Sequence, residues 1–162
     1  MPMTLEGPLA DRARWQADAC SVGKAMDVVG TRSAMLLIRE AFYGTTRFDD
    51  FASRVGITDA IAAARLKELV AAGIFAKRPY REPGQRTRYE YVLTEMGQDL
   101  LPALLALMRW GDRYLQEGGE GPVDVVAAET GEPVEVSPRT SEGVAVDADA
   151  LKVRLNRRRA PR

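Results

Sequence analysis

Between residues 46 and 94 the sequence changes from a helical to an extended pattern, and this order constrains the fold more than any other feature. Two segments with helical spacing of apolar residues, 47–55 and 59–72, each end at a glycine, Gly56 and Gly73. Only a short turn separates them, which is the arrangement of a helix-turn-helix motif. The spacing of the second helix predicts the side chains that face the core: Ile61, Leu66, Leu69 and Val70.

The extended part has the pattern of a β-hairpin. Residues 74–80 and 87–93 are rich in aromatic and β-branched side chains, and Pro83-Gly84 marks the turn between them. A hairpin directly after a helix-turn-helix is a wing. The predicted fold is therefore mostly α-helical with a β-wing, a winged helix-turn-helix, followed by a small β-rich C-terminal extension.

Helical segments flank this motif on both sides. Apolar spacing predicts helices over 22–29 and 33–43 before it and one long helix over 95–116 after it, with Pro102 as the place of a kink. The long helix carries more apolar side chains than a small domain needs, which favours a homodimer, although these residues would otherwise only close the core of the monomer. The predicted interface residues are Trp15, Leu101, Leu104, Leu105, Met108 and Trp110.

Three parts follow from this pattern. Residues 1–19 are expected to form an N-terminal arm with a short helix that carries Trp15. Residues 20–117 are expected to form the winged helix-turn-helix domain for DNA binding and dimerisation. Residues 118–162 are expected to form a small β-rich extension with a basic tail.

The extension contains two strand patterns. Val123–Val126 and Val134–Val136 flank a turn and predict a hairpin, and the alternation over Leu151–Asn156 predicts a third strand. Residues 117–149 hold nine acids and one base. Two interpretations remain: this acidic stretch shields the wing, or it is a solvated surface.

Composition narrows the possible functions. The chain has one cysteine, Cys20, and no histidine, which removes the base of Ser-His-Asp and Cys-His catalysis and makes a Cys/His zinc site implausible. We therefore expect no enzyme, no cofactor and no metal. No apolar run is long enough to cross a bilayer, and the N-terminus lacks the pattern of a secretory signal, so a cytoplasmic location is expected.

The formal net charge of +0 hides separated charges. Residues 77–90 contain five bases and two acids, and residues 152–162 contain six bases and no acid. A local basic patch can bind phosphates even on a neutral chain. A solvated basic hairpin is the alternative, but beside a helix-turn-helix the pattern favours double-stranded DNA as the partner.

Several short motifs occur in a characteristic order. They are Cys20-Ser21-Val22, Val29-Gly30, Leu36-Leu37-Ile38-Arg39, Arg47-Phe48, Arg65–Leu69 with Gly73, Arg88-Tyr89-Glu90-Tyr91, Leu93-Thr94 with Gly97, and Trp110-Gly111. On these motifs the chain resembles the HxlR-type branch of winged-helix transcription regulators, relatives of the MarR group. It departs from the resemblance at Ser33, where many relatives have tryptophan, at Ser21, where a proline often follows the cysteine, and at the unusually apolar stretch Ala60–Ala64.

The resemblance implies a DNA-binding regulator of transcription, a repressor that binds a palindromic operator as a homodimer. It also implies control by oxidation or by a small molecule. Cys20 is the candidate redox sensor, with Lys24 one helical turn away to favour the thiolate, although a lone cysteine also serves as a small core residue. A small-molecule effector would bind near the long helix, beside Trp110 or Tyr43.

The second helix of the motif is expected to enter the major groove with its N-terminal side chains. Its alanines either contact thymine methyl groups or only favour the helix, and Asp59 is placed to accept from a cytosine amine. The wing arginines and the start of the first helix are expected to hold phosphates. The predicted DNA-binding residues are Thr46, Arg47, Thr58, Asp59, Ala60, Ala63, Arg65, Lys67, Arg78, Arg81, Arg86 and Arg88.

One alternative function remains, a winged-helix module that binds proteins and does not touch DNA. The arginines of the predicted wing favour DNA, since an acidic or apolar wing would instead suit a protein partner.

Overall fold

The computed structural model describes residues 3–11, 13 and 20–156. They form two units, one over Ser21–Asp124 and one that joins the described residues before 21 to those after 124. Most of the predicted helix with Trp15, and the basic tail over 157–162, lie outside the described residues. None of the helices in the described ranges is long and apolar enough to cross a membrane.

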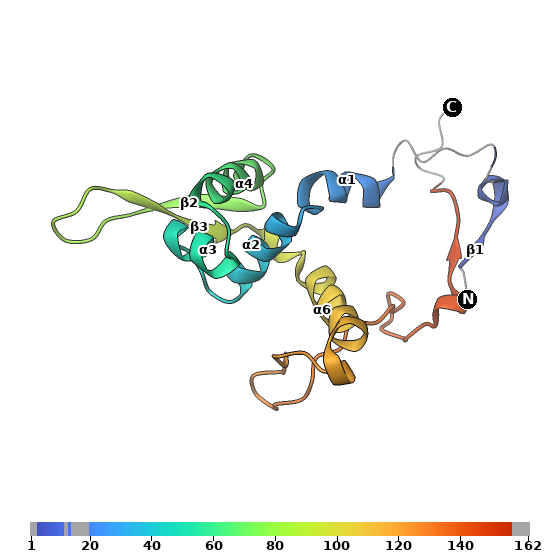
Figure 1. Cartoon of the computed structure of the whole chain (residues 1–162). Coiled ribbons are helices and arrows are strands. Elements are labelled where there is room, and N and C mark those ends of the chain that lie inside the picture. Colours follow the sequence, from blue (N-terminus) through green and yellow to red (C-terminus); the bar gives the residue numbers. More distant parts are fainter. Residues whose placement is uncertain (1–2, 12, 14–19, 157–162) are drawn as a thin grey trace. The chain divides into compact units, whose positions relative to one another are not determined.

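The first unit begins with four helices. Their bounds are Ser21–Val29 for α1, Arg32–Phe42 for α2, Phe48–Val55 for α3 and Asp59–Ala71 for α4 (Figure 1). Helices α2, α3 and α4 contact one another. Gly56 ends α3 with φ 69°, and Gly73 follows α4 with φ 82°, so both take the left-handed conformation that favours glycine. The predicted helix-turn-helix is confirmed.

The core of this unit combines side chains from the helices and from the hairpin that follows. Phe51 of α3 meets Phe75 edge-on with ring centroids 5.8 Å apart, and its ring centroid is 6.3 Å from that of Tyr91. Such edge-to-face pairs add to the free energy gained by burial. The largest fully buried side chains are Phe51, Phe75, Leu37, Ile38, Leu66, Leu69 and Ile74.

The prediction for Ile61 is wrong. Ile61 is 47% exposed, whereas Ala62 is fully buried and points to the core with Leu66 and Leu69. Positions 62, 66 and 69 repeat at helical spacing, so the register set by the two leucines brings an alanine inward and turns the isoleucine out. The helix therefore shows an apolar side chain to solvent in its first turns.

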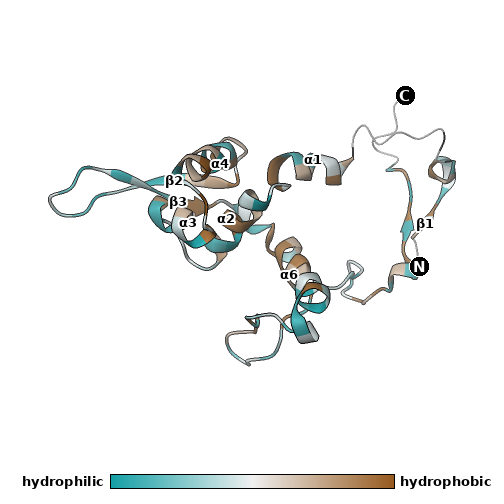
Figure 2. Ribbon diagram, in the orientation of Figure 1, coloured by the Kyte–Doolittle hydropathy of each residue, from teal (hydrophilic) through white to brown (hydrophobic). Residues whose placement is uncertain are grey.

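The wing consists of two antiparallel strands, β2 over Phe75–Tyr80 and β3 over Arg88–Leu93. Their register runs from the pair Phe75 and Leu93 to the pair Tyr80 and Arg88. The hairpin extends beyond the three helices that hold its base (Figure 1), and its outer part is hydrophilic (Figure 2). The predicted wing is confirmed.

The predicted long helix is broken in two. Helix α5 covers Glu95–Gln98, helix α6 covers Leu101–Leu115, and Pro102 lies in the first turn of α6. Proline has no amide hydrogen, and its ring collides with the carbonyl four residues earlier, so it is tolerated only at the start of a new helix. The break therefore replaces the expected kink.

One face of α6 carries apolar side chains that the described chain leaves uncovered. Leu107, Trp110 and Tyr114 are 55%, 55% and 59% exposed, and they repeat at helical spacing. We call these three residues the α6 stripe; α6 is largely apolar in Figure 2. On α1, Val22 and Met26 are exposed as well.

The predicted interface residues lie mostly off this stripe. Leu104 is buried within the chain, Leu105 and Met108 are half-buried, and Leu101 is 38% exposed. Of the predicted set, only Trp110 belongs to the α6 stripe, and Trp15 lies outside the described residues. Both faces of α6 are apolar, so periodicity alone does not reveal which of them packs on α2.

The second unit has little regular structure. Strand β1 over Thr4–Leu5 pairs in parallel with β4 over Lys152–Val153, and a 3-10 helix covers Gly7–Ala10. The predicted third strand is thus shorter than Leu151–Asn156 and pairs with the N-terminal arm. The predicted hairpin is reduced to a single bridge between Val126 and Pro133.

Candidate nucleic-acid interface

The first turns of α4 present mostly small side chains to solvent. Thr58 is the N-cap, and its hydroxyl accepts a hydrogen bond from the Ile61 amide at 3.3 Å. The other predicted contact residues that are exposed on α4 are Asp59, Ala60, Ala63 and Lys67. Arg65 is instead half-buried, and its guanidinium is paired with the Glu68 carboxylate one turn later. The structure thus turns Arg65 away from the outer face of the helix.

The residue at the N-cap position of α3 is Arg47. Arg47, not Thr46, has the extended N-cap conformation, and its side chain makes no capping bond. Thr46 faces the wing: its carbonyl accepts from the Tyr91 amide at 2.8 Å, and its hydroxyl helps to lower the pKa of Glu90. Thr46 therefore ties the helix-turn-helix to strand β3.

Arg47, like Thr46, contacts the wing. Its guanidinium carbon lies 3.2 Å from the ring centroid of Tyr80, which is a cation–π contact. Among the described residues, its buried Nη1 has no hydrogen-bond partner. The stack holds one positive charge in place at the N-terminus of α3, where the helix dipole also favours an anion.

Two of the predicted wing arginines are engaged within the hairpin. The Nε of Arg78 donates to Glu90 at 2.6 Å, and that of Arg81 donates to the Gln85 carbonyl at 3.0 Å. The hydrogen bond from Arg78 lowers the pKa of Glu90, partial burial opposes this shift, and the Thr46 hydroxyl and the charge of Arg47 support it. These contacts stiffen the wing, and they leave Arg78 and Arg81 with fewer free N–H donors for a phosphate.

Arg86 and Arg88 behave differently, because both are exposed and neither forms an ion pair with a described residue. Together with the start of α3 they border a hollow of about 550 Å³ between the wing and the helix-turn-helix. Its charged lining is four cations, Arg47, Lys77, Arg86 and Arg88, and one acid, Asp49. This excess of positive charge suits a phosphate backbone.

The predicted DNA-binding residues do not include Lys77, Tyr80, Tyr89 and Tyr91, which also line this hollow. Lys77 lies with its ammonium 5.7 Å from the ring centroid of Tyr91 and 6.0 Å from that of Tyr89. The ring of Tyr80 stacks on the Arg47 guanidinium. Alternation along β2 and β3 already groups Lys77 with Tyr89 and Tyr91, since the register pairs Lys77 with Tyr91.

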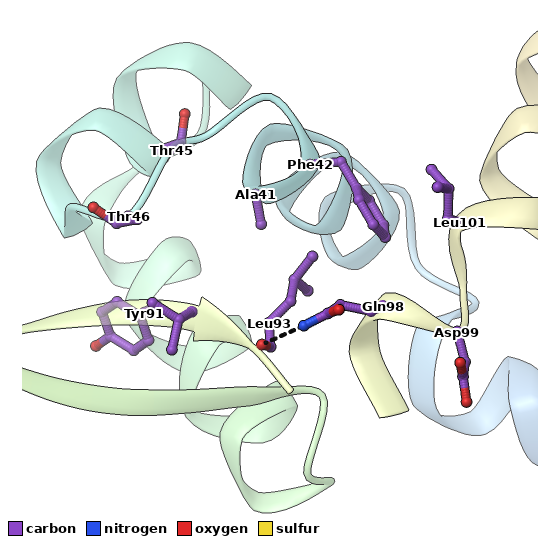
Figure 3. A pocket seen from close by; sticks show the side chains of 10 residues that line it. Ala41, Phe42, Thr45, Thr46, Tyr91, Leu93, Gln98, Asp99 and Leu101 are labelled. Atoms are coloured by element: carbon purple, nitrogen blue, oxygen red, sulfur yellow. Dashed lines mark hydrogen bonds between the residues drawn. The ribbon is translucent and has the colours of Figure 1, made fainter. Parts of the chain in front are cut away.

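A second hollow of about 550 Å³ lies between the end of α2, strand β3 and the break before α6 (Figure 3). Ala41, Phe42, Leu93 and Leu101 give it an apolar wall, and Gln98 donates weakly to the Leu93 carbonyl at 3.4 Å. The predicted effector contacts, Trp110 and Tyr43, are absent from its lining. In Figure 3 the Asp99 carboxylate points away from it.

Cys20 is exposed, directly before α1. In the described ranges, no three cysteine or acidic side chains gather in a way that could hold a metal ion.

Comparison with known proteins gives a family match. A model described as HxlR-like helix-turn-helix matches residues 28–118, which covers the helical unit from the end of α1 to the end of α6. An uncharacterised HTH-type transcriptional regulator of Mycobacterium tuberculosis is 45% identical over 102 residues. That alignment covers 63% of this chain and only 63% of the relative's length.

Solved structures agree with this match. The crystal structure of PA1607, described as a candidate transcription factor, has a TM-score of 0.74 and 34% identity, and covers 87% of this chain and 96% of its own. The reduced form of the redox regulator HypR has a TM-score of 0.51 and 32% identity, and covers 56% of this chain and 89% of its own. The named relatives are transcriptional regulators, in agreement with the prediction that the chain is no enzyme.

Proposed function

The chain belongs to the HxlR-like helix-turn-helix family, and on this premise we propose that it binds double-stranded DNA and regulates transcription as a homodimer. Helix α4 would enter the major groove, and the wing would follow the adjacent backbone. The observation that carries the proposal is the cationic hollow between the wing and α3, with Arg86 and Arg88 exposed at its edge. A regulator bound to DNA would act in the cytoplasm, as the sequence predicts.

The homodimer is supported by the α6 stripe. Three large apolar side chains at helical spacing, each more than half exposed, are the kind of face that a second copy covers. A twofold dimer presents two α4 helices in opposite directions, so its operator would be a palindrome. A dimer seated on a promoter excludes polymerase, and repression is therefore the form of regulation proposed.

The alternative function, a protein-interaction module, fits the wing less well. Arg86 and Arg88 would remain solvated charges beside a protein partner, whereas along DNA each would release counterions. A mobility-shift assay on the DNA immediately upstream of the coding region separates the two functions. A shift that survives competitor DNA supports regulation by DNA binding, and no shift at low salt contradicts it.

Replacing both Arg86 and Arg88 with alanine is expected to flatten the salt dependence of DNA binding. Loss of two phosphate contacts should reduce the slope of log K against log salt by about 2. Fluorescence anisotropy at several salt concentrations measures it. The double variant Lys24→Ala with Arg139→Ala removes the same charge from exposed positions away from the wing and the basic tail, and it should leave the slope unchanged. Equal slopes in the wing variant and wild type would contradict a role for the wing.

Control by oxidation is a second element of the proposal. Cys20 is exposed, and HypR, which resembles this chain in fold, is named a redox regulator. With one thiol in the chain, oxidation by diamide would join the Cys20 side chains of two copies, the diazene being reduced to its hydrazine. We expect operator affinity to change on the order of tenfold, with a covalent dimer on a non-reducing gel. Cys20→Ser is the control, and unaltered operator binding after treatment would rule the sensor out.

A small-molecule effector is the other form of control that the family suggests. The hollow of Figure 3 is the recess we assign to it. Its lining contains no lysine or arginine, so an uncharged apolar molecule suits it better than a carboxylate.

A further inference from the structure

The outer face of α4 is apolar where a DNA-reading helix is usually polar. Ala60, Ile61, Ala63 and Ala64 are all exposed in its first two turns, with Ile61 at 47%. We propose that α4 recognises DNA mainly through apolar contacts with thymine methyl groups, with Ile61 as the principal reading residue. This inference rests on the proposed function, and it adds which base the DNA must contain where α4 lies.

The exposure of Ile61 follows from the helix register and not from a loose fold. Ala62 is fully buried one position further along, and Leu66 follows it at 0% exposure. The amide of Ile61 is also held by the Thr58 cap. The isoleucine therefore lies on an ordered first turn. A single exposed apolar residue would need no explanation, but Ile61 is surrounded by three exposed alanines and forms an apolar surface with them.

Few polar side chains near Ile61 are free to form hydrogen bonds with the edges of the bases. The Thr58 hydroxyl accepts the capping bond, and Arg65 is drawn back to Glu68. Residues 58–64 include no Asn, Gln, Arg or Lys, the side chains that form bidentate bonds with adenine or guanine. What remains at the N-terminal end is the acceptor Asp59, which suits the cytosine amine.

The major groove offers one apolar group, the C5-methyl of thymine. Alanine side chains are short enough to let the helix backbone approach the base edges closely, and Ile61 extends further than they do. Contact between the Ile61 side chain and a methyl group removes apolar surface from water on both sides. Half-sites preferred by this chain should therefore contain thymine under α4.

The experiment uses the full chain and a pool of random-sequence duplexes. The enriched sequence is synthesised with each thymine replaced in turn by deoxyuridine, which keeps every hydrogen-bonding group and removes only the methyl. We expect wild-type affinity to fall about fourfold at the thymines under α4, the effect of one buried methyl-sized group. In Ile61→Ala the same replacement should change affinity less than about twofold at one of these positions, because the partner of the methyl is gone.

Lys67→Ala is the matched control on the same helix. It should weaken binding to all duplexes and leave the uracil effect unchanged, since a phosphate contact carries no base information. Thermal melting of Ile61→Ala should match wild type, because the residue is exposed. Uracil without effect at every thymine, or an unchanged effect in Ile61→Ala, would overturn the inference while DNA binding stands. Enrichment of no DNA at all would overturn the proposed function, and this inference with it; the apolar face of α4 would then suit a protein partner.

Discussion

Replacing Trp110 with arginine is expected to convert the proposed homodimer to a monomer and to weaken operator binding by at least about 100-fold. Trp110 is 55% exposed at the centre of the α6 stripe, and its ring lies 5.8 Å from that of Tyr114. A charged side chain there would have to be desolvated in the proposed interface, and in the monomer it would stay in water. Two half-sites bound by one dimer gain a factor of roughly 10² to 10⁴ over one half-site, and that factor would be lost.

Sedimentation at micromolar concentration and anisotropy on the operator measure both parts of this result. Gln116→Arg adds the same charge immediately beyond α6 and should leave mass and affinity unaltered. The dimer proposal fails if wild type sediments as a monomer, or if Trp110→Arg keeps the mass of two chains. Because Trp110 is exposed, the variant should retain its fold, which circular dichroism checks.

Gly97→Ala is expected to destabilise the helical unit by about 3 kcal/mol, which would lower Tm by on the order of 15 °C. A Cβ at this buried glycine would lie 2.4 Å from the Ile74 carbonyl oxygen and 2.9 Å from Cδ2 of Leu93. The carbonyl cannot give way easily, because it already accepts from the Thr94 amide at 3.0 Å. Helix α5 would therefore have to move away from Ile74 and from Leu93, the last residue of strand β3.

Differential scanning calorimetry at fixed protein concentration measures this loss. Met96→Ala is the control, because it introduces the same residue at the neighbouring position of α5, where the side chain is 55% exposed. It should change stability by less than about 0.5 kcal/mol. A Gly97→Ala variant as stable as wild type would mean that the close approach of α5 to Ile74 does not hold in solution.

The helix-turn-helix and the wing could be predicted because local signals mark them. Gly56 and Gly73 stand at left-handed positions, and Pro83-Gly84 separates two alternating segments. The prediction for Ile61 fails because the helical spacing of the buried Leu66 and Leu69 continues to position 62 and not to 61. The sequence therefore does contain the register of α4, but the two leucines indicate it and the isoleucine does not.

Other features depend on contacts between distant residues. Nothing local indicates that Arg78 would pair with Glu90 across the strands. The choice between the two apolar faces of α6 depends on which of them meets α2. The candidate site was therefore predicted as a region, whereas the arginines that remain available within it, Arg86 and Arg88, emerged only from the structure.

The parallel pairing of Thr4–Leu5 with Lys152–Val153 has a consequence for the order of folding. It joins segments separated by almost the whole chain, so the entropy lost on closing that loop is the largest of any contact described. Only a few hydrogen bonds and the ion pair between Lys152 and Glu6, at 3.1 Å, offset this loss of entropy. The helices and the wing, built from contacts close in sequence, should therefore assemble first during synthesis, and the two ends of the chain should meet last and separate first.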